Sequence, residues 1–387
     1  MVVQHNLQAM NSNRMLGVTT SSQAKVTEKL SSGYKINRAA DDAAGLSISE
    51  KMRKQIRGLD QASNNAQDGV SAVQTAEGAL AEVHDMLQRM NELAVQAANG
   101  TNSTSDRTAI QNEIDQLTTE IDRVAETTKF NETYLLKGDP KSSETKTIKL
   151  QPHDAGLKGS MGKVATDGTV KFTVPQLKES DTVMIGGKQY TIKDTNTDTS
   201  LGQITKANAY LEMGKELTKA NQIGADSKIN AVTNTDNEFT ITLGSQTVQK
   251  ALSFNLHVGA DADMTNKIGV SIETMNSAYL GVKGLDVVGT DGLGTQATYA
   301  IDAIADAIQK VSDQRSALGA VQNRLEHTIK NLDNVVENTT AAESQIRDTD
   351  MASTMVEYTK NNILQQAGQS MLAQANQSTQ GVLSLLG

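Results

Sequence analysis

The sequence contains no cysteine and no tryptophan, and only 3 of its 387 residues are proline. The missing cysteines exclude disulfides, thiol nucleophiles and cysteine-based metal sites. They leave the redox compartment open, because a chain without cysteine is stable in oxidising and reducing surroundings alike. Aromatic residues make up only 3% of the chain, a composition that suits long thin helices better than a thick packed core.

Basic clusters and long apolar runs are also missing. The formal net charge is −9, and no basic face with interleaved aromatics is present, so we expect no nucleic-acid binding. No segment approaches the roughly twenty apolar residues that a membrane span needs, and we therefore expect no membrane insertion. The first residues, MVVQHN, lack a basic region followed by an apolar one, so we expect no cleavable signal peptide.

Residue types that serve catalysis and metal binding are present without a functional spacing. The histidines are scattered with no HExxH or comparable ligand pattern: His5, His84, His153, His257 and His327. The carboxylate pairs Asp41 with Asp42 and Asp348 with Asp350 are typical of helix caps rather than of acid–base catalysts. The glycine-rich stretch 284–294 lacks the Lys and Ser/Thr of a P-loop. We therefore expect no enzymatic activity, no cofactor and no metal.

The strongest pattern in the chain is a seven-residue repeat over residues 301–346. Its seam consists of Ile301, Ile304, Ile308, Val311, Arg315, Leu318, Gln322, Leu325, Ile329, Leu332, Val336, Thr339, Glu343 and Ile346. No Pro and only one Gly, Gly319, interrupt it, which predicts a single helix about 70 Å long at 1.5 Å per residue. A narrow apolar stripe buries nothing on an isolated helix, so a partner helix of similar length is required.

A second ladder with the same spacing supplies that partner. It comprises Leu59, Ala62, Ala66, Gly69, Val73, Ala76, Leu80, Val83, Leu87, Met90 and Ala94. Its small residues let the large seam side chains approach closely, and each side chain so buried is worth roughly 1.5–3 kcal/mol. The polar seam members Arg315, Gln322, Thr339 and Glu343 are interpreted as positions that set the register. The sequence thus predicts a mainly α protein built on a long antiparallel coiled-coil rod, formed by the N- and C-terminal regions.

Between residues 140 and 286 turn residues and β-branched runs replace the heptads, which predicts an inserted α+β outer domain. Expected strands are 169–174, 182–185 paired with 190–192 across Gly186-Gly187, and 238–243 paired with 247–248 across Gly244-Ser245; a helix is expected over 201–220. Before this region, a loop at 99–105 separates the ladder helix from a shorter one carrying Ile110 and Val124. The short connection predicts that these two helices are antiparallel.

Both ends of the chain are nearly free of charge. Residues 1–13 and 361–387 contain no Asp, Glu, Lys or Arg, while apolar residues recur there at helical spacing. The candidates for polymerisation are Val3, Leu7, Met10, Leu364, Met371, Val382, Leu383, Leu385 and Leu386. A thin rod cannot cover this apolar surface, so we predict that the termini pair and bury their remaining faces against other copies of the chain. Head-to-tail contacts that do not close into a ring produce a filament.

Several longer motifs resemble those of bacterial flagellins. Residues 30–46 read LSSGYKINRAADDAAGL, 55–59 QIRGL, 74–80 QTAEGAL, 363–367 ILQQA, 373–376 AQAN and 382–386 VLSLL. The resemblance covers about residues 1–138 and 287–387. It implies a subunit that self-assembles into the flagellar filament for motility. It also implies type III export with a chaperone bound to the C-terminal helix, secretion to the extracellular flagellum, and contact with cap and hook–filament junction proteins.

The resemblance also implies a division into domains. Residues 1–45 and 347–387 are expected to be terminal helices forming the filament inner core, 46–139 and 287–346 the helical rod, and 140–286 a variable outer domain. Two other functions remain open at this point. One is a hook–filament junction protein or a non-polymerising secreted coiled-coil adhesin, and the other is an enzyme in the middle domain.

Flagellins further resemble one another at a helical patch recognised by Toll-like receptor 5. In this sequence the implied recognition residues are Gln88, Arg89, Leu93, Ile110 and Glu113. Asn91 stands where many receptor-active members have Arg. The alternative interpretation of the polar members of this set is an ordinary solvated helix face.

Overall fold

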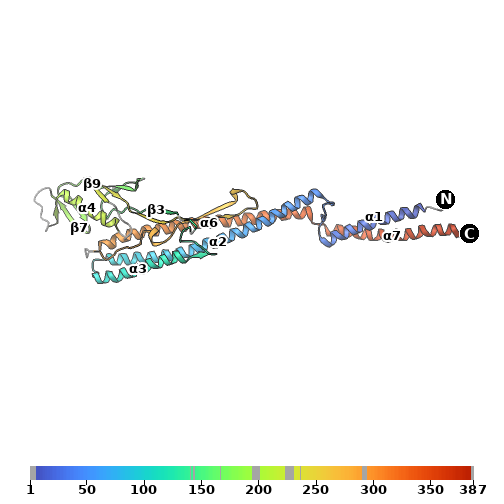
Figure 1. The fold of residues 1–387 in the computed structure, drawn as a ribbon, viewed down its shortest axis with the longest axis horizontal. Helices are drawn as coiled ribbons and strands as arrows, with labels where there is room; N and C mark the ends of the chain where they lie inside the picture. The colour runs from blue at the N-terminus through green and yellow to red at the C-terminus, as the bar shows by residue number, and fades with distance from the viewer. Residues whose placement is uncertain are drawn as a thin grey trace. The chain divides into compact units, whose positions relative to one another are not determined.

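The computed structural model describes residues 6–139, 141–142, 144–165, 167–193, 201–222, 231–235, 237–289 and 294–384; the side chains of 231, 233–235 and 378–384 are outside that description. The described helices are α1 (Leu7–Ser32), α2 (Ala43–Ala98), α3 (Thr104–Thr127), α4 (Lys206–Asn221), α5 (Ser277–Leu280), α6 (Thr295–Arg347) and α7 (Met351–Ser384) (Figure 1). The chain divides into two compact units. Unit 1 comprises residues 1–65, 257–266 and 328–387, and unit 2 comprises residues 66–256 and 267–327.

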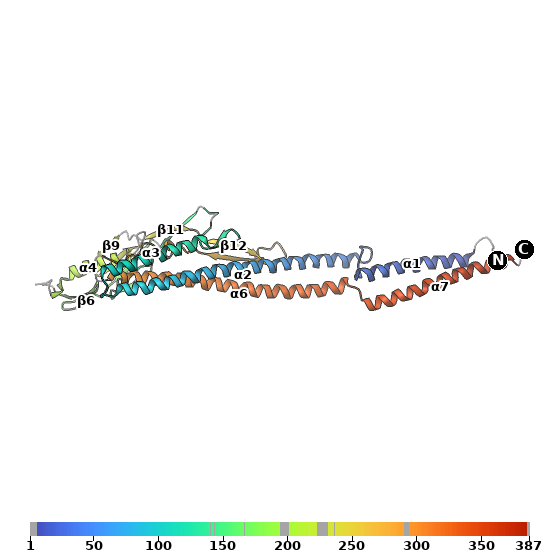
Figure 2. The ribbon, with the colours of Figure 1, turned by 90° about the horizontal axis from the view of Figure 1, so that it is seen from below.

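In unit 1, α1 and α7 lie side by side and run antiparallel (Figure 1 and Figure 2). Asn6 begins α1 by accepting the backbone N–H of Ala9 at 3.0 Å, and its amide donates to the carbonyl of Ala375 at 3.0 Å. Further along, a Cβ at Gly368 would stand 3.3 Å from the Leu16 side chain. The glycine therefore permits the close approach of α7 to α1. We call α1 and α7 the terminal helix pair.

Helices α2 and α6 pair along their lengths within each unit. In unit 1, Arg53 of α2 lies 3.3 Å from Glu343 and Ser63 donates to Asp333 at 3.2 Å. Since the residue numbers rise along α2 as they fall along α6, the helices are antiparallel. Every residue of the predicted seam and ladder is buried or half-buried. The predicted coiled coil is confirmed.

The polar seam residues differ in whether their partners lie on the facing helix or on their own helix. Arg315 reaches Glu77 across the helix pair in unit 2 at 3.7 Å, and Glu343 reaches Arg53 in unit 1. Gln322 instead donates to Glu326 on its own helix at 3.0 Å. Cross-helix pairs such as those of Arg315 and Glu343 favour one register over a shifted one.

The first part of unit 2 is a three-helix arrangement in which α3 returns along α2. Ser103 and Asp106 form a capping box at the start of α3, which satisfies two otherwise unpaired N–H groups. The buried face of α3 includes Ile114 and Ile121, as its spacing predicted. After α3, the antiparallel strands β1 (Lys129–Phe130) and β2 (Thr133–Tyr134), each two residues long, form a hairpin.

The remaining strands form small sheets. They are β3 (Thr145–Lys149), β4 (Ser160–Met161), β5 (Thr169–Thr173), β6 (Thr182–Ile185), β7 (Lys188–Ile192), β8 (Gln203–Ile204), β9 (Ala231–Thr235), β10 (Glu238–Thr242), β11 (Ser245–Gln249), β12 (Leu252–His257) and β13 (Lys267–Ile272). The strand orders are β4-β5-β10-β9, β6-β7-β8, β11-β3 and β12-β13, and α4 contacts β6, β7 and β9. Phe172 and Tyr210 flank Phe239 with ring centroids 6.5 and 6.4 Å away, in the core that α4 covers. The predicted inserted α+β region is confirmed.

Two details of that region differ from expectation. The predicted pairing of 238–243 with 247–248 is wrong: β10 pairs with β5 and β9, and β11 pairs with β3. Both edges of β10 are occupied, so it has no edge left for the strand that follows it. The helix expected from residue 201 begins at Lys206 because Thr205 is its N-cap, with β8 before it. Among the described residues, no helix is both long and apolar enough for a membrane crossing.

Candidate functional site

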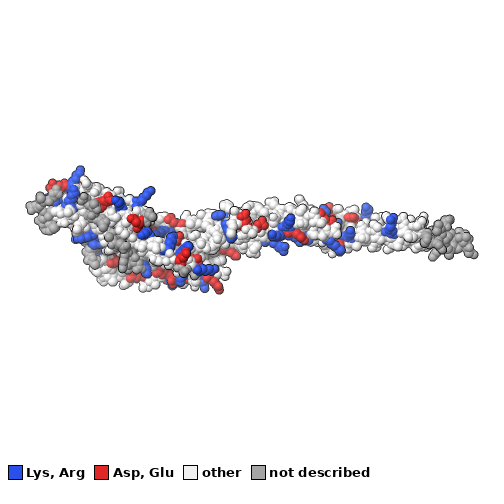
Figure 3. Space-filling view, turned by 45° about the horizontal axis from the view of Figure 1, so that its top comes forward, with Lys and Arg blue, Asp and Glu red and all other residues white. Residues whose placement is uncertain are grey.

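The terminal helix pair exposes many large apolar side chains. They are Leu7, Met10, Met15 and Val18 on α1, and Met351, Met355, Val356, Ile363, Leu364 and Met371 on α7. Leu7 is 73% exposed and Met371 57% exposed. On the face seen in Figure 3, few charged side chains interrupt the described outer part of this pair. Large apolar side chains exposed in this number on two neighbouring helices mark a site of association with another molecule.

The predicted polymerisation residues fall into three groups. Leu7, Met10, Leu364 and Met371 are exposed on the terminal helix pair. Val382 and Leu383 belong to α7, but their side chains lie outside the described residues, as do Val3, Leu385 and Leu386 entirely. Six further exposed residues of the terminal helix pair were not among the predicted candidates, although they too recur at helical spacing: Met15, Val18, Met351, Met355, Val356 and Ile363.

Two short segments of unit 1, residues 33–42 and 348–350, connect the terminal helix pair to α2 and α6; we call them the junction. Backbone hydrogen bonds tie the segments together: Lys35 N–H donates to the Arg347 carbonyl at 2.7 Å and Thr349 N–H to the Gly33 carbonyl at 3.0 Å. The Tyr34 ring lies between two guanidinium groups, 4.8 Å from Arg347 and 5.7 Å from Arg53. Cation–π contacts of this geometry contribute about 0.5–2 kcal/mol each.

The junction carboxylates stabilise turns and helix starts. Asp41 accepts the backbone N–H groups of Arg38 and Asn37 at 2.9 and 3.2 Å, and these bonds lower the pKa of its carboxyl. Asp42 accepts the Gly45 N–H at 2.9 Å at the start of α2. At the start of α7, the Asp350 carboxylate accepts the Ala352 N–H at 2.9 Å and the Ser353 N–H at 3.3 Å. Asp42 and Asp350 therefore have the capping role that their positions predicted.

A second cluster of polar side chains lies in unit 2, where α3 packs against α2. The Arg89 guanidinium donates to Glu113 of α3 at 2.9 Å and to Glu92 at 3.1 Å, and the hydrogen bond from Glu113 is the larger cause of the raised pKa of Arg89. Gln88 lies one residue away, with its amide 3.0 Å from the ring of His84. We call Gln88, Arg89, Glu92 and Glu113 the Arg89 patch.

The five predicted receptor residues do not share one environment. Gln88, Arg89 and Glu113 are exposed. Leu93 is only 2% exposed and Ile110 only 7%, because both pack into the interior between α2 and α3. In this conformation the three polar residues are accessible from solvent, while the two apolar ones pack between the helices beneath them.

Arg107 of α3 is a buried residue that the sequence argument missed. It is 1% exposed, and its Nε donates to the Ala97 carbonyl at 2.9 Å while Nη2 donates to the Asn99 carbonyl at 3.3 Å. These carbonyls lie at the C-terminal end of α2, where a cation also meets the negative end of the helix dipole. Arg107 thus fixes the turn that brings α3 back along α2 and positions the Arg89 patch.

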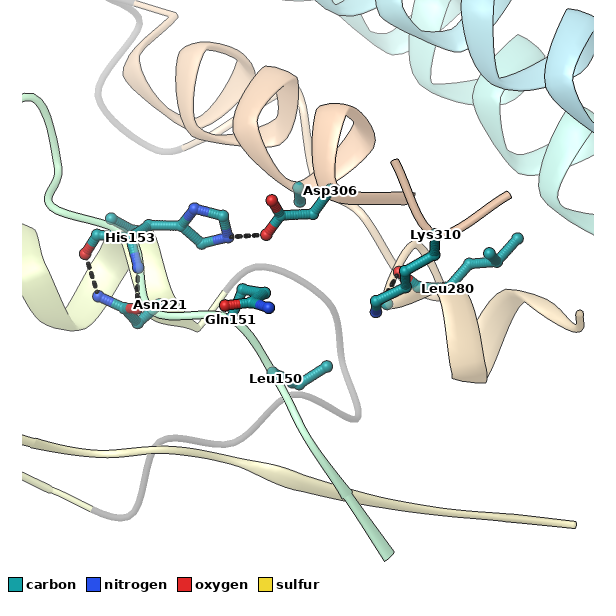
Figure 4. Close-up of a pocket in the computed structure, with 10 residues that line it drawn as sticks. Leu150, Gln151, His153, Asn221, Leu280, Asp306 and Lys310 are labelled. Atoms are coloured by element: carbon teal, nitrogen blue, oxygen red, sulfur yellow. Dashed lines mark hydrogen bonds and ion pairs between the residues drawn. The ribbon is translucent and has the colours of Figure 1, made fainter. Parts of the chain in front are cut away.

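One small cavity of unit 2 holds several polar side chains (Figure 4). Its volume is about 30 Å³, room for a water-sized occupant. His153 faces Asp306 at 3.8 Å, and Asn221 hydrogen-bonds both backbone groups of His153 at 2.8 Å. Lys310 donates to the Leu280 carbonyl at 3.2 Å, and burial lowers the pKa of this lysine. These contacts fasten a loop and a helix end to α6.

Known proteins resemble the whole chain. Residues 3–141 match the bacterial flagellin N-terminal helical region and residues 301–386 the bacterial flagellin C-terminal helical region. A flagellin of Clostridium tyrobutyricum is 44% identical over 400 residues, covering 98% of this chain and 100% of the relative. A flagellin of Halalkalibacterium halodurans is 40% identical over 386 residues and covers both chains fully. A flagellar filament 31.3 kDa core protein of Treponema maltophilum is 39% identical over 388 residues, again over both full lengths.

The fold defines a class: a mainly helical protein built on paired long helices, with a β-rich insertion and large apolar side chains exposed on its terminal helix pair. Within the described residues, no group of three or more His, Cys, Asp or Glu is placed to hold a metal ion. The chain belongs to the bacterial flagellin family, the structural subunits of flagellar filaments.

Proposed function

We propose that the chain polymerises with copies of itself into a flagellar filament through the apolar surface of the terminal helix pair. The observation that supports this is the exposure of large side chains on both helices, with Leu7 at 73% and Met371 at 57%. Each such side chain gains roughly 1.5–3 kcal/mol when a neighbour removes it from water. Several of them together offset an association cost of about 4–15 kcal/mol.

The proposed division of labour follows from that surface. Residues 1–45 and 347–387 form the inner core of the filament, 46–139 and 287–346 form the rod, and 140–286 form the outer domain. The role is structural rather than enzymatic. We further propose that the chain is secreted through the flagellar export channel and that an export chaperone binds α7. In the filament it contacts the cap and hook–filament junction proteins. The protein is then extracellular.

Seeded elongation tests self-assembly. The double variant Leu7→Ser/Met371→Ser removes two exposed apolar side chains without touching a buried one, and we expect it to elongate seeds far more slowly than the parent. Met184→Ser is the matched control, because Met184 is 60% exposed in the proposed outer domain. Elongation of the double variant at the parent rate contradicts the proposed surface. If the parent itself elongates no seed, a junction protein or an adhesin becomes the better assignment.

We also propose that the Arg89 patch is a contact surface for Toll-like receptor 5. The proximity of Gln88, Arg89 and Glu113 on an exposed surface supports this, since Glu113 holds the Arg89 guanidinium in one orientation. Leu93 and Ile110 contribute by packing beneath the surface rather than by touching the receptor. Arg enrichment at binding hot spots makes Arg89 the residue with the largest expected effect.

A receptor reporter-cell assay tests this surface. Arg89→Ala and Glu113→Ala should each weaken signalling by about tenfold, the loss expected when a hot-spot side chain costs more than 1 kcal/mol. The control is Arg123→Ala, which removes another exposed α3 ion pair, that with Glu120. Asn91→Arg, the residue of many receptor-active relatives, should strengthen signalling. Equal potency of the parent, Arg89→Ala and Glu113→Ala removes the patch from consideration.

A further inference from the structure

The loop that joins β12 to β13, residues 258–266, presents an uncovered acidic tip in unit 1; we call it the acidic loop. Asp261 and Asp263 are exposed, and Met264, the residue after Asp263, is 75% exposed. Asp263 accepts the Thr265 N–H at 3.0 Å, and that bond lowers the pKa of its carboxyl, so it is ionised at neutral pH. Among the described residues, nothing pairs with the Asp261 carboxylate.

A basic pocket of about 350 Å³ lies between α2 and α6 in the same unit, lined by Arg53, Ile56, Arg57, Thr340 and Glu343. Arg53 is already engaged, with Nε 3.3 Å from Glu343 and Nη2 donating to the Tyr34 hydroxyl at 3.3 Å. Arg57 is exposed, and within the described part of the chain it has no hydrogen bond or ion pair. The pocket therefore offers one unengaged positive charge beside the apolar side chain of Ile56.

The acidic loop and the basic pocket lie on different faces of α2. The loop rests on Gly58, where an added Cβ would stand 3.0 Å from the Ala260 Cβ. At about 100° per residue, Arg57, Arg53 and Ile56 are rotated about 100°, 140° and 160° from Gly58 around the helix axis. The helix itself separates the two surfaces, so they do not meet within one chain.

We infer that the acidic loop of one copy docks into the basic pocket of a second copy. Asp261 and Asp263 face Arg57, and Met264 packs against Ile56. The charges are complementary, and the chain itself supplies both surfaces, which makes a second copy the occupant of the pocket. Two different surfaces on separate faces of a helix make a head-to-tail contact, which builds a helical polymer when the rotation between copies does not close into a ring. The inference rests on the self-assembly proposed above and assigns one of its lateral contacts.

Charge reversal on the full-length protein tests the contact. The variants are Arg57→Glu, Asp261→Lys and the two combined, and the readout is the critical concentration for polymerisation, measured by sedimentation. Each single reversal replaces an attraction by a repulsion and should raise the critical concentration about three- to tenfold. In the double variant the charges are swapped, so the value should return to within about twofold of the parent. Arg57→Lys and Asp261→Glu keep the charges and should match the parent.

Neither reversed side chain has a partner among the described residues of its own chain, so circular dichroism and thermal unfolding of the monomers should be unchanged. If the parent polymerises and the single reversals keep its critical concentration, the docking inference is overturned while the filament function stands. A rise without recovery in the double variant also overturns it, because Arg57 and Asp261 then contact different partners. If the parent does not polymerise, both the inference and the proposed function fall.

Discussion

Replacing the buried Arg107 should destabilise unit 2 far more than replacing an exposed arginine on the same helix. Arg107 donates to the carbonyls of Ala97 and Asn99. Hydrogen bonds from a charged donor contribute about 1.5–3 kcal/mol each, and Arg107→Ala leaves both carbonyls without this donor, so the loss should be about 3–6 kcal/mol. Arg123→Ala is the control: Arg123 is exposed and, within the described part of the chain, its side chain pairs with Glu120 alone, so its loss should be below about 1 kcal/mol.

The assay needs a local readout as well as a global one. Guanidinium unfolding of depolymerised monomer, followed by circular dichroism, gives the overall change. Two units need not unfold in one step, so hydrogen exchange at the last turn of α2 and the first turn of α3 gives the local change. A loss below about 1 kcal/mol for Arg107→Ala, or equal losses for the two arginines, would refute the role assigned to these bonds.

Three further predictions concern the coiled coil and the junction. Leu80 is fully buried, so Leu80→Ala should cost about 2–5 kcal/mol in chemical denaturation, whereas Val95→Ala, at a 52% exposed position, should cost below about 0.5 kcal/mol. Tyr34→Ala removes the ring between two guanidinium groups and should speed hydrogen exchange at the Thr349 amide; Tyr34→Phe should not. The lowered pKa of Asp41 means that its stabilising bonds are complete above the ordinary value of 3.8 and are lost only as pH falls through the lower folded value; an NMR titration midpoint above 3.8 contradicts this.

The helical part of the fold could be predicted because its signal is local and periodic. A seam at every third and fourth residue over 301–346, matched by small residues around Gly69, identifies both helices and their pairing. At Gly69 an added Cβ would stand 3.3 Å from the Leu325 side chain, which is the close approach that the small residues indicated. The unpaired apolar spacing at the chain ends likewise identified Leu7 and Met371 as surface candidates.

The missed features depend on contacts that sequence spacing does not carry. A Gly-Ser turn signal favoured pairing of β10 with β11, but strand pairing is decided by distant segments, here β5 and β3. Arg107 bonds to backbone carbonyls, which every residue possesses, so no side-chain pattern marks its partners. Leu93 matched a receptor motif, yet its burial depends on how α3 packs against α2. Pairing partners, backbone acceptors and burial all require the three-dimensional arrangement.

The junction gives the terminal helix pair a double attachment. Residues 33–42 and 348–350 are separate covalent connections. The Gly33–Thr349 hydrogen bond joins them to each other, and the Lys35–Arg347 hydrogen bond joins the first to the end of α6. A twisting force on the terminal helices therefore acts on both connecting segments at once. Rotation of one segment about the other must first break these hydrogen bonds. The terminal helix pair is therefore held to α2 and α6 by two covalent connections and by the hydrogen bonds of the junction.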